Sequence, residues 1–218
     1  MTTDKGRTSL PLTIPRLYAI LDVEQIAARS AEQVCESLLD AGVRLFQYRH
    51  KHGSSRQIFE GIRRLLPIIH ESGGLLIVND RADVALVAGA DGVHLGQDDL
   101  PVGLARRVLK PGQWLGCSTH NLDQLRVADA SSADYLAFGP VFPTSSKEAP
   151  DPTVGLAGLA EARQATSKPL VAIGGITVSN ARQVIQQGAD FVAVISGLLG
   201  APDPAARARE FLSTLSRS

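Results

Sequence analysis

Polar and charged side chains recur along this chain, each group directly after a short run of apolar residues. The cations in such positions are Arg49, Lys51 and Lys147, and the carboxylates are Asp80 and Asp99. Neutral polar residues stand in equivalent positions: Gln47, Asn79, Ser118, Thr144, Ser146 and Ser196. Parallel strands bring their carboxyl ends to one side of a sheet or barrel, where side chains from separate strands can meet. We therefore take these residues as candidates for one common site.

The shared chemistry of these groups is the binding of phosphate. Guanidinium, ammonium and hydroxyl groups all suit phosphate oxygens. Asp80 and Asp99 are hard oxygen ligands, and two carboxylates together with substrate phosphates are the usual way to hold Mg²⁺. A magnesium ion beside several anion-binding groups indicates a diphosphate substrate.

Two further segments predict a separate anion site near the end of the chain. Gly174 and Gly175 follow the apolar run 169–173, and Ile195 and Ser196 follow the run 191–194. Glycine lets a backbone approach a ligand closely, and exposed backbone N–H groups attract an anion. In a (β/α)₈ barrel the loops after strands seven and eight are the usual phosphate site. Two phosphorylated ligands at one end of a barrel predict group transfer between them.

The carboxylates and cations also have structural interpretations. Asp80 could cap a helix that begins just after it, and Asp98 with Asp99 could cap the next helix. Arg49 and Lys51 could belong to a solvated loop, which is the usual place of a charge pair. The glycines could simply turn tight loops.

The histidines and cysteines are weaker candidates. His94 lies inside an apolar run, which is more typical of a hydrogen-bonded core histidine than of a ligand. His120 is more typical of a capping or supporting group, and Cys35 and Cys117 of packing residues. The long segment 139–154 suits an active-site lid better than a plain surface loop.

Apolar runs alternate with helical patterns along the chain, and these elements must position the candidate residues. The predicted strands are 16–22, 43–48, 75–78, 92–95, 114–117, 134–138, 169–173 and 191–194. The predicted helices are 31–41, 54–72, 81–88, 101–109, 121–129, 156–166, 177–187 and 203–215. Such alternation predicts parallel βαβ units, and eight of them close naturally into a barrel. The predicted fold class is therefore an α/β protein with a single TIM (β/α)₈ barrel domain, 16–218, after a polar tail, 1–15.

Composition narrows the functional class. The 22 basic residues balance 22 acidic ones, which gives no sign of a nucleic-acid or anionic-membrane surface. The apolar runs are too short to cross a bilayer, and residues 1–15 lack the apolar core of a signal peptide. The 2 cysteines lack metal-ligand spacing and favour a reducing compartment. We expect a cytoplasmic protein that acts on small molecules, with no nucleic-acid or membrane partner; a homo-oligomer is left open.

Several segments together resemble the thiamine phosphate synthase family. They are QYRHK at 47–51, NDR at 79–81, DGVHLGQDD at 91–99, GCSTH at 116–120, GPVFPTSSK at 139–147, AIGGI at 172–176 and VIS at 194–196. They follow the family order and cover most of the chain, and the segments 91–99 and 139–147 are the most specific. Small departures occur, such as Leu21 and Ser146 where the family commonly has threonine, but none removes a charge.

The resemblance implies an Mg²⁺-dependent transferase. Such an enzyme joins 4-amino-5-hydroxymethyl-2-methylpyrimidine diphosphate to 4-methyl-5-hydroxyethylthiazole phosphate and releases pyrophosphate by a dissociative, carbocation-like step. The resemblance implies pyrophosphate binding by Arg49, Lys51, Asn79 and Lys147, and Mg²⁺ binding by Asp80 and Asp99. It implies pyrimidine contacts from Gln47 and Ser118, phosphate contacts from Thr144 and Ser146, and thiazole phosphate binding by Gly175, Ile195 and Ser196. The chemical step would then depend on Arg49, Lys51, Lys147 and Ser118.

Three other functions remain as alternatives. A thiazole tautomerase of the same fold would use a histidine for proton transfer, with His120 as the candidate. The retained metal carboxylates and phosphate-binding cations argue against it, because a tautomerase has no pyrophosphate to hold. A non-catalytic phosphate-binding barrel would need no Mg²⁺ carboxylates. A phosphosugar isomerase or epimerase would need an acid–base pair that this sequence does not offer clearly.

Overall fold

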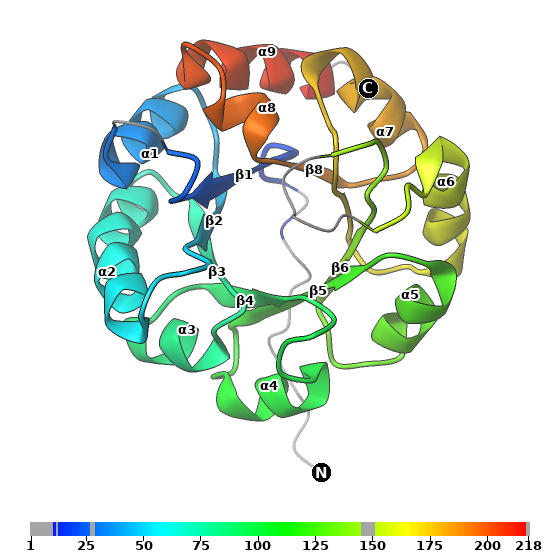
Figure 1. Ribbon diagram of the computed structural model, residues 1–218, viewed down its shortest axis with the longest axis horizontal. Helices are drawn as coiled ribbons and strands as arrows, with labels where there is room; N and C mark the ends of the chain where they lie inside the picture. The colour runs from blue at the N-terminus through cyan, green and yellow to red at the C-terminus, as the bar shows by residue number, and fades with distance from the viewer. Residues whose placement is uncertain (1–10, 12, 27–28, 145–150, 217–218) are drawn as a thin grey trace.

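The computed structural model describes residues 11, 13–26, 29–144 and 151–216, which form a closed barrel of eight parallel strands in sequence order (Figure 1). The strands are β1 (Leu17–Asp22), β2 (Leu45–Arg49), β3 (Leu75–Asn79), β4 (Gly92–Leu95), β5 (Trp114–Thr119), β6 (Tyr135–Phe138), β7 (Leu170–Ala172) and β8 (Phe191–Val194). Pairing of β1 with β8, for example Leu17 opposite Val192, closes the ring. The predicted (β/α)₈ barrel is confirmed.

Helices surround this barrel on its outside (Figure 1). They are α1 (Ala31–Asp40), α2 (Ser55–Glu71), α3 (Ala82–Ala88), α4 (Val102–Val108), α5 (Leu122–Asp129), α6 (Gly155–Ala165), α7 (Val178–Gln186), α8 (Ser196–Leu199) and α9 (Pro204–Ser216). Every residue of β4, β6, β7 and β8 is buried, because helices cover the outer face of a parallel sheet and side chains fill the inside. No helix in the described part of the chain is long and apolar enough to cross a membrane.

Helix starts follow simple local chemistry. Ser30 and Ser54 form capping boxes with Gln33 and Gln57, so side chains satisfy the backbone groups that the first helical turn leaves without partners. Asn121 caps α5, and its side chain accepts the backbone N–H of Gln124. Helix α8 was not predicted, because four residues are too few to show helical periodicity. It lies inside the ring of outer helices, next to α9 (Figure 1).

Carboxylates hold the amino-terminal end of the barrel together in a repeated arrangement. Three aspartates directly precede the even-numbered strands β4, β6 and β8, and they are Asp91, Asp134 and Asp190. Each accepts a backbone N–H of the preceding odd-numbered strand at 2.7–2.8 Å, from Leu76, Leu115 and Leu170 respectively. Each also pairs with a basic side chain of the helix that directly precedes this odd-numbered strand: His70 of α2, Arg106 of α4 and Arg163 of α6. The role of these three aspartates is thus structural.

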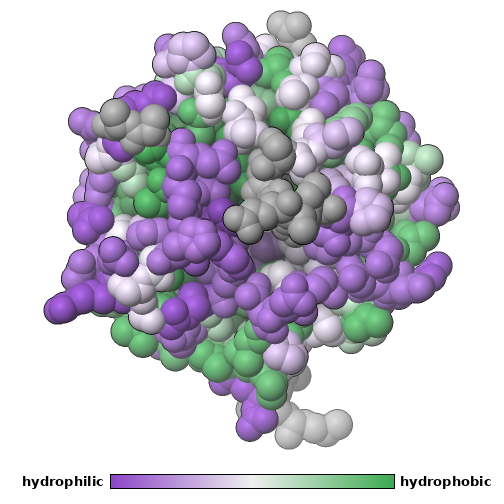
Figure 2. All heavy atoms as spheres, in the orientation of Figure 1, coloured by the Kyte–Doolittle hydropathy of each residue, from purple (hydrophilic) through white to green (hydrophobic). Residues whose placement is uncertain are grey.

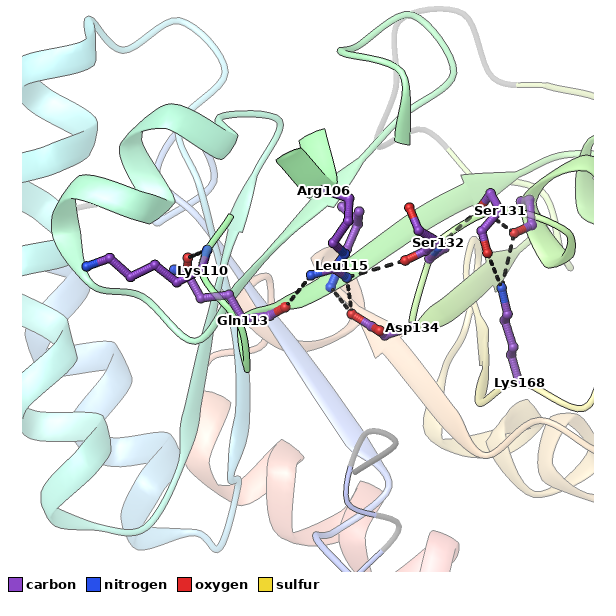
Figure 3. Close-up of polar contacts among 10 residues, drawn as sticks. Arg106, Lys110, Gln113, Leu115, Ser131, Ser132, Asp134 and Lys168 are labelled. Carbon is purple, nitrogen blue, oxygen red and sulfur yellow. Dashed lines mark hydrogen bonds and ion pairs between the residues drawn. The ribbon is translucent and has the colours of Figure 1, made fainter. Parts of the chain in front are cut away.

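The Arg106–Asp134 pair is the most buried of these three (Figure 3). Besides Asp134, the Arg106 guanidinium donates to the carbonyl oxygens of Gln113 at 2.8 Å and Ser132 at 3.3 Å. One side chain of α4 therefore connects the start of β5 with the start of β6.

Candidate active site

A cavity of about 450 Å³ opens at the carboxyl ends of the strands. Hydrophilic residues gather around this central hollow on the face shown in Figure 2. Many of the residues that the sequence singled out line it: Gln47, Arg49, Asn79, Ser118, Thr144, Gly175, Ile195 and Ser196. The predicted Ser146 and Lys147 lie outside the described residues. The barrel thus brings side chains from β2, β3, β5 and β8 to one mouth.

Arg49 is held by a carboxylate, Asp22, that is not among the residues predicted for the site. Asp22, at the end of β1, is fully buried and pairs through Oδ2 with Nη1 of Arg49. Asp22 also accepts the backbone N–H of Glu24 at 3.1 Å and the side-chain amide of Gln25 at 3.3 Å. Burial raises the pKa of Asp22, and the positive charge of Arg49 opposes that rise. The only sequence signal was a carboxylate at the end of an apolar strand.

Lys51, Asp80 and Asp99 form a charged cluster beside the cavity, outside its lining. Lys51 Nζ lies 3.0 Å from Asp80 Oδ2, and Asp99 Oδ2 accepts the backbone N–H of Gly96 at 2.7 Å. Burial and then the neighbouring Asp80 raise the pKa of Asp99 to about 6. Two carboxylates that interact in this way oppose each other's ionisation, and a nearby cation relieves that repulsion.

The capping interpretation of the two carboxylates is wrong. Helix α3 starts after Arg81 without a side-chain cap, and α4 starts after Pro101, also without one. Asp80 instead has a φ of 62°, which is unusual for a residue other than glycine. Its backbone N–H donates to the carbonyl of His94 at 2.8 Å, which ties the end of β3 to β4.

The pair Asp80 and Asp99 is suited to a divalent cation. Within the described ranges, no cluster of three or more His, Cys, Asp or Glu residues forms a metal site. Magnesium is typically bound through one or two carboxylates, with water and substrate phosphates completing its coordination. The donor set therefore fits Mg²⁺ held jointly with a phosphorylated ligand.

The Gly174-Gly175 turn forms the opposite wall of the cavity. Its φ angles are +87° and +65°. A Cβ would lie 2.4 Å from Pro140 Cβ at the first position and 2.5 Å from the Pro143 carbonyl oxygen at the second. Glycine is therefore required here both by backbone conformation and by the close approach of the β6–α6 loop. Asn180 Nδ2 donates to the Gly175 carbonyl at 3.0 Å and holds the turn from α7.

His94 is a hydrogen-bonded interior residue, as its place in an apolar strand predicts. It is 7% exposed, with Nδ1 at 3.0 Å from Tyr135 Oη and Nε2 at 2.8 Å from Ser118 Oγ. It also lines the cavity. Ser118 is therefore held from inside the barrel while its hydroxyl borders the cavity.

His120 connects β5 to the long loop after β6. Its Nδ1 donates to the Gly139 carbonyl at 2.6 Å, and its Nε2 lies 3.5 Å from Asp151 Oδ2. Both His120 and Asp151 line the cavity. These contacts agree with the supporting role expected for His120. Sequence patterns did not single out Asp151, because nothing in the sequence shows that the end of this loop returns to the mouth.

Comparisons with known proteins agree on one family. The family model described as thiamine monophosphate synthase matches residues 17–198. A thiamine-phosphate synthase of Koribacter versatilis is 50% identical over 208 residues, which cover 94% of this chain and 97% of that protein. One of Chloroflexus aurantiacus is 45% identical over 201 residues, covering 92% and 93% of the two chains. The structure of a thiamine phosphate pyrophosphorylase from Pyrococcus furiosus has a TM-score of 0.84 and 34% identity, and covers 92% of this chain and 95% of its own.

Proposed function

This chain belongs to the thiamine monophosphate synthase family, and we propose that it joins the pyrimidine diphosphate and the thiazole phosphate named above into thiamine phosphate. Relatives that are 45% to 50% identical over nearly the whole chain carry the name of this transferase activity. The observation that carries the site assignment is one cavity that has Arg49 on one side, next to the cluster of Lys51, Asp80 and Asp99, and the glycine turn on the other.

The charged side would take the diphosphate. Arg49 and Asn79 line the cavity, and Lys51 lies next to the carboxylate pair. Asp22 orients the Arg49 guanidinium, so its remaining N–H groups can address phosphate oxygens. Lys147 would join this group, as the resemblance implies.

Asp80 and Asp99 would hold Mg²⁺ on the same side. When bound, the ion would help to neutralise the charge of the departing pyrophosphate. A dissociative step needs this neutralisation more than it needs a protein nucleophile. Fixed cations at Arg49 and Lys51 contribute to it without reorganisation, since ion pairs already hold both side chains.

The glycine turn would take the monophosphate of the thiazole substrate. Gly175, Ile195 and Ser196 all line this part of the cavity. The turn offers close backbone approach, and Ser196 adds a hydroxyl donor. The β6–α6 loop packs against the same turn, with the Phe142 N–H donating to the Gly174 carbonyl at 3.1 Å, and Thr144 of that loop lines the cavity. Two phosphate sites facing one cavity suit the transfer of a group between them.

The pyrimidine ring would lie between these two sites, deeper in the barrel. Gln47 and Ser118 would contact it from opposite sides of the mouth, on β2 and β5. The alternative of a tautomerase has no specific support, since the relatives described above carry the synthase name.

The direct test is to incubate the purified protein with both substrates and MgCl₂ and to separate the products chromatographically. We expect thiamine phosphate and pyrophosphate in equal amounts, and no product when Mg²⁺ is chelated. Binding of either ligand without product would favour a non-catalytic phosphate-binding barrel and contradict the proposal.

A further inference from the structure

A chain of four hydrogen bonds crosses the inside of the barrel and connects two cavity residues, Gln47 and Ser118. Gln47 Nε2 lies 3.0 Å from Tyr18 Oη, which lies 3.2 Å from Tyr135 Oη. Tyr135 Oη lies 3.0 Å from His94 Nδ1, and His94 Nε2 lies 2.8 Å from Ser118 Oγ. The five residues come from β2, β1, β6, β4 and β5, so the chain spans the barrel interior.

The interior is shaped to allow this chain. Tyr18 and Tyr135 are 1% and 0% exposed, and their rings meet edge to face at a centroid distance of 6.4 Å. The His94 ring stacks on Tyr135 at 5.5 Å. A Cβ at Gly116 of β5 would lie 2.1 Å from Tyr135 Cζ and 2.5 Å from His94 Nδ1. Glycine at this strand position therefore leaves the space in which Tyr135 and His94 meet.

The donor-to-acceptor direction of these four hydrogen bonds follows from the first of them. Gln47 Nε2 can only donate, so Tyr18 Oη accepts from it and has its own proton left for Tyr135. Tyr135 then donates to His94 Nδ1, and His94 Nε2–H donates to Ser118 Oγ. Burial raises the pKa of both tyrosines, so each keeps the one proton that this order requires. Reversing any single bond leaves a buried donor or acceptor without its partner, which is unfavourable.

We propose that Tyr18, Tyr135 and His94 act as a relay that sets the hydrogen-bonding polarity of Gln47 and Ser118 together. In this order Gln47 presents its carbonyl oxygen, an acceptor, to the cavity, while Ser118 presents its O–H, a donor. Tyr135 is a positioning residue, because it lies behind His94 and Tyr18 and does not itself line the cavity.

The relay would select the class of ring that enters. An aminopyrimidine offers an N–H donor and a ring-nitrogen acceptor, which complement the carbonyl of Gln47 and the hydroxyl of Ser118. The corresponding oxopyrimidine would place its carbonyl against the Gln47 carbonyl, so two acceptors would face each other. To bind this ring, the protein would have to flip the Gln47 side-chain amide and reverse all four hydrogen bonds of the relay. This inference rests on the proposed function, since it assigns the ring specificity of that same site.

The first test measures the relay without any ligand. In protein labelled with ¹⁵N-histidine, the His94 signals are assigned by comparison with His94→Asn. We expect unprotonated Nδ1 and protonated Nε2 in the wild type, and a mixture of tautomers in Tyr135→Phe. A protonated Nδ1 in the wild type, or an unchanged spectrum in Tyr135→Phe, would overturn the proposal.

The second test measures ring selection by calorimetry, without the chemical step. The ligands are 4-amino-5-hydroxymethyl-2-methylpyrimidine and its 4-oxo counterpart. We expect the wild type to bind the amino compound at least about a hundredfold more tightly, because the oxo compound leaves buried polar groups unpaired. Tyr135→Phe should reduce that ratio by about tenfold or more, and Tyr18→Phe serves if Tyr135→Phe does not fold.

Tyr48→Phe is the matched control. Tyr48 is a buried tyrosine of β2 that takes no part in the relay and lies beside Gly61 of α2. An unchanged ratio in Tyr135→Phe, or an equal loss in Tyr48→Phe, would overturn the proposal. If the wild type binds neither pyrimidine, the ring selection by the relay is contradicted. If it forms no thiamine phosphate in the product assay, the proposed function fails, while the histidine spectra still decide whether the relay exists.

Discussion

At the scale of single residues, the site depends on charges that are positioned by other charges. Arg49 pairs with the fully buried Asp22, and Lys51 pairs with Asp80. A guanidinium held by a carboxylate on one edge keeps a fixed direction for the N–H groups on the other edge. If Arg49 binds the diphosphate as proposed, Asp22 controls a substrate-binding residue without touching the substrate.

Asp22→Asn tests this dependence. Loss of the carboxylate charge frees the Arg49 guanidinium, so we expect KM for the pyrimidine diphosphate to rise by about tenfold, equivalent to about 1.4 kcal/mol. KM for the thiazole phosphate should stay unchanged, because the glycine turn is formed by other strands. Steady-state kinetics with each substrate varied in turn measures both values. A rise confined to the thiazole phosphate would show that the two phosphate sites are interchanged.

The pKa of Asp99 predicts how magnesium binding varies with pH. Burial and Asp80 raise that pKa from 3.8 to about 6, so the folded protein holds this proton more tightly than the unfolded chain. The Asp99 contribution to metal-free stability therefore decreases as the pH rises through about 6, and Mg²⁺ affinity increases over the same interval. At a pH one unit below the pKa, protonation should weaken Mg²⁺ binding by about tenfold.

Calorimetric titration of Mg²⁺ in the presence of pyrophosphate, repeated across this pH range, measures the effect. Asp99→Asn should bind Mg²⁺ weakly at every pH, and its activity should require far more Mg²⁺. Asp98→Asn is the control, because Asp98 is the exposed neighbouring carboxylate and should behave as the wild type. A pH-independent affinity in the wild type would contradict the assignment of Asp99 as a metal ligand.

At the scale of elements, the ends of β6, β7 and β8 together form the cavity wall that we propose for the monophosphate. The β6–α6 loop continues the pairing with β7, with the Val141 N–H donating to the Ile173 carbonyl at 2.8 Å. Asn180 of α7 holds the same turn from the outside. The turn is therefore enclosed by two neighbouring elements, and its shape depends on having no side chains of its own.

Gly175→Ala tests this wall, with Gly89→Ala as the control. Both glycines have positive φ, +65° and +73°, so this backbone conformation alone should cost alanine about 1 kcal/mol of stability at each position. A Cβ at Gly89 meets nothing within 4 Å, whereas one at Gly175 would clash with Phe142 and Pro143. We expect only Gly175→Ala to raise KM for the thiazole phosphate, by about tenfold or more, which corresponds to about 1.4 kcal/mol of lost binding. Equal KM values for the thiazole phosphate in the two variants would show that the glycine turn is not part of the binding site.

At the scale of the whole molecule, the two ends of the barrel have separate tasks. The carboxyl ends of the strands carry the cavity, and the amino ends carry the aspartates that join neighbouring strands. Changes at the amino-terminal end should therefore alter stability without altering catalysis, as expected for barrels of this class.

Arg106→Met tests this separation. It leaves Asp134, whose side chain is 12% exposed, without its cation and removes the donors to Gln113 and Ser132. We expect a loss of about 3 kcal/mol in the free energy of unfolding, measured by urea denaturation, because removing the cation from a mostly buried ion pair is costly. kcat and KM at low temperature should not change.

Arg126→Met is the matched control. The Arg126–Asp123 pair is on the surface, with side chains 63% and 94% exposed, so its removal should change stability by less than about 0.5 kcal/mol. A similar loss of unfolding free energy in both variants would show that the buried Arg106–Asp134 pair stabilises the protein no more than a surface pair does.

Most of the strands, helices and cavity residues could be predicted, because the sequence patterns that indicate them are local. A buried parallel strand appears in the sequence as an apolar run, and a helix appears as apolar residues at helical spacing. The order of these elements shows which side chains follow the strands. Gln47, Asn79, Ser118 and Gly175 were identified in this way, and all of them line the cavity. Helix α8 was missed because its four residues make only about one helical turn, which is too short to show a repeating pattern.

The sequence by itself therefore determined the alternation of strands and helices, the closed barrel, the chemistry at its mouth and the family. Only the tertiary structure decided which of those groups pair: Arg49 with Asp22, Lys51 with Asp80, and Tyr135 with His94. These partners lie 27, 29 and 41 residues apart. Whether two such side chains meet depends on strand register and on the direction in which each points across the barrel. Those are properties of the closed sheet, and no short stretch of the chain contains them.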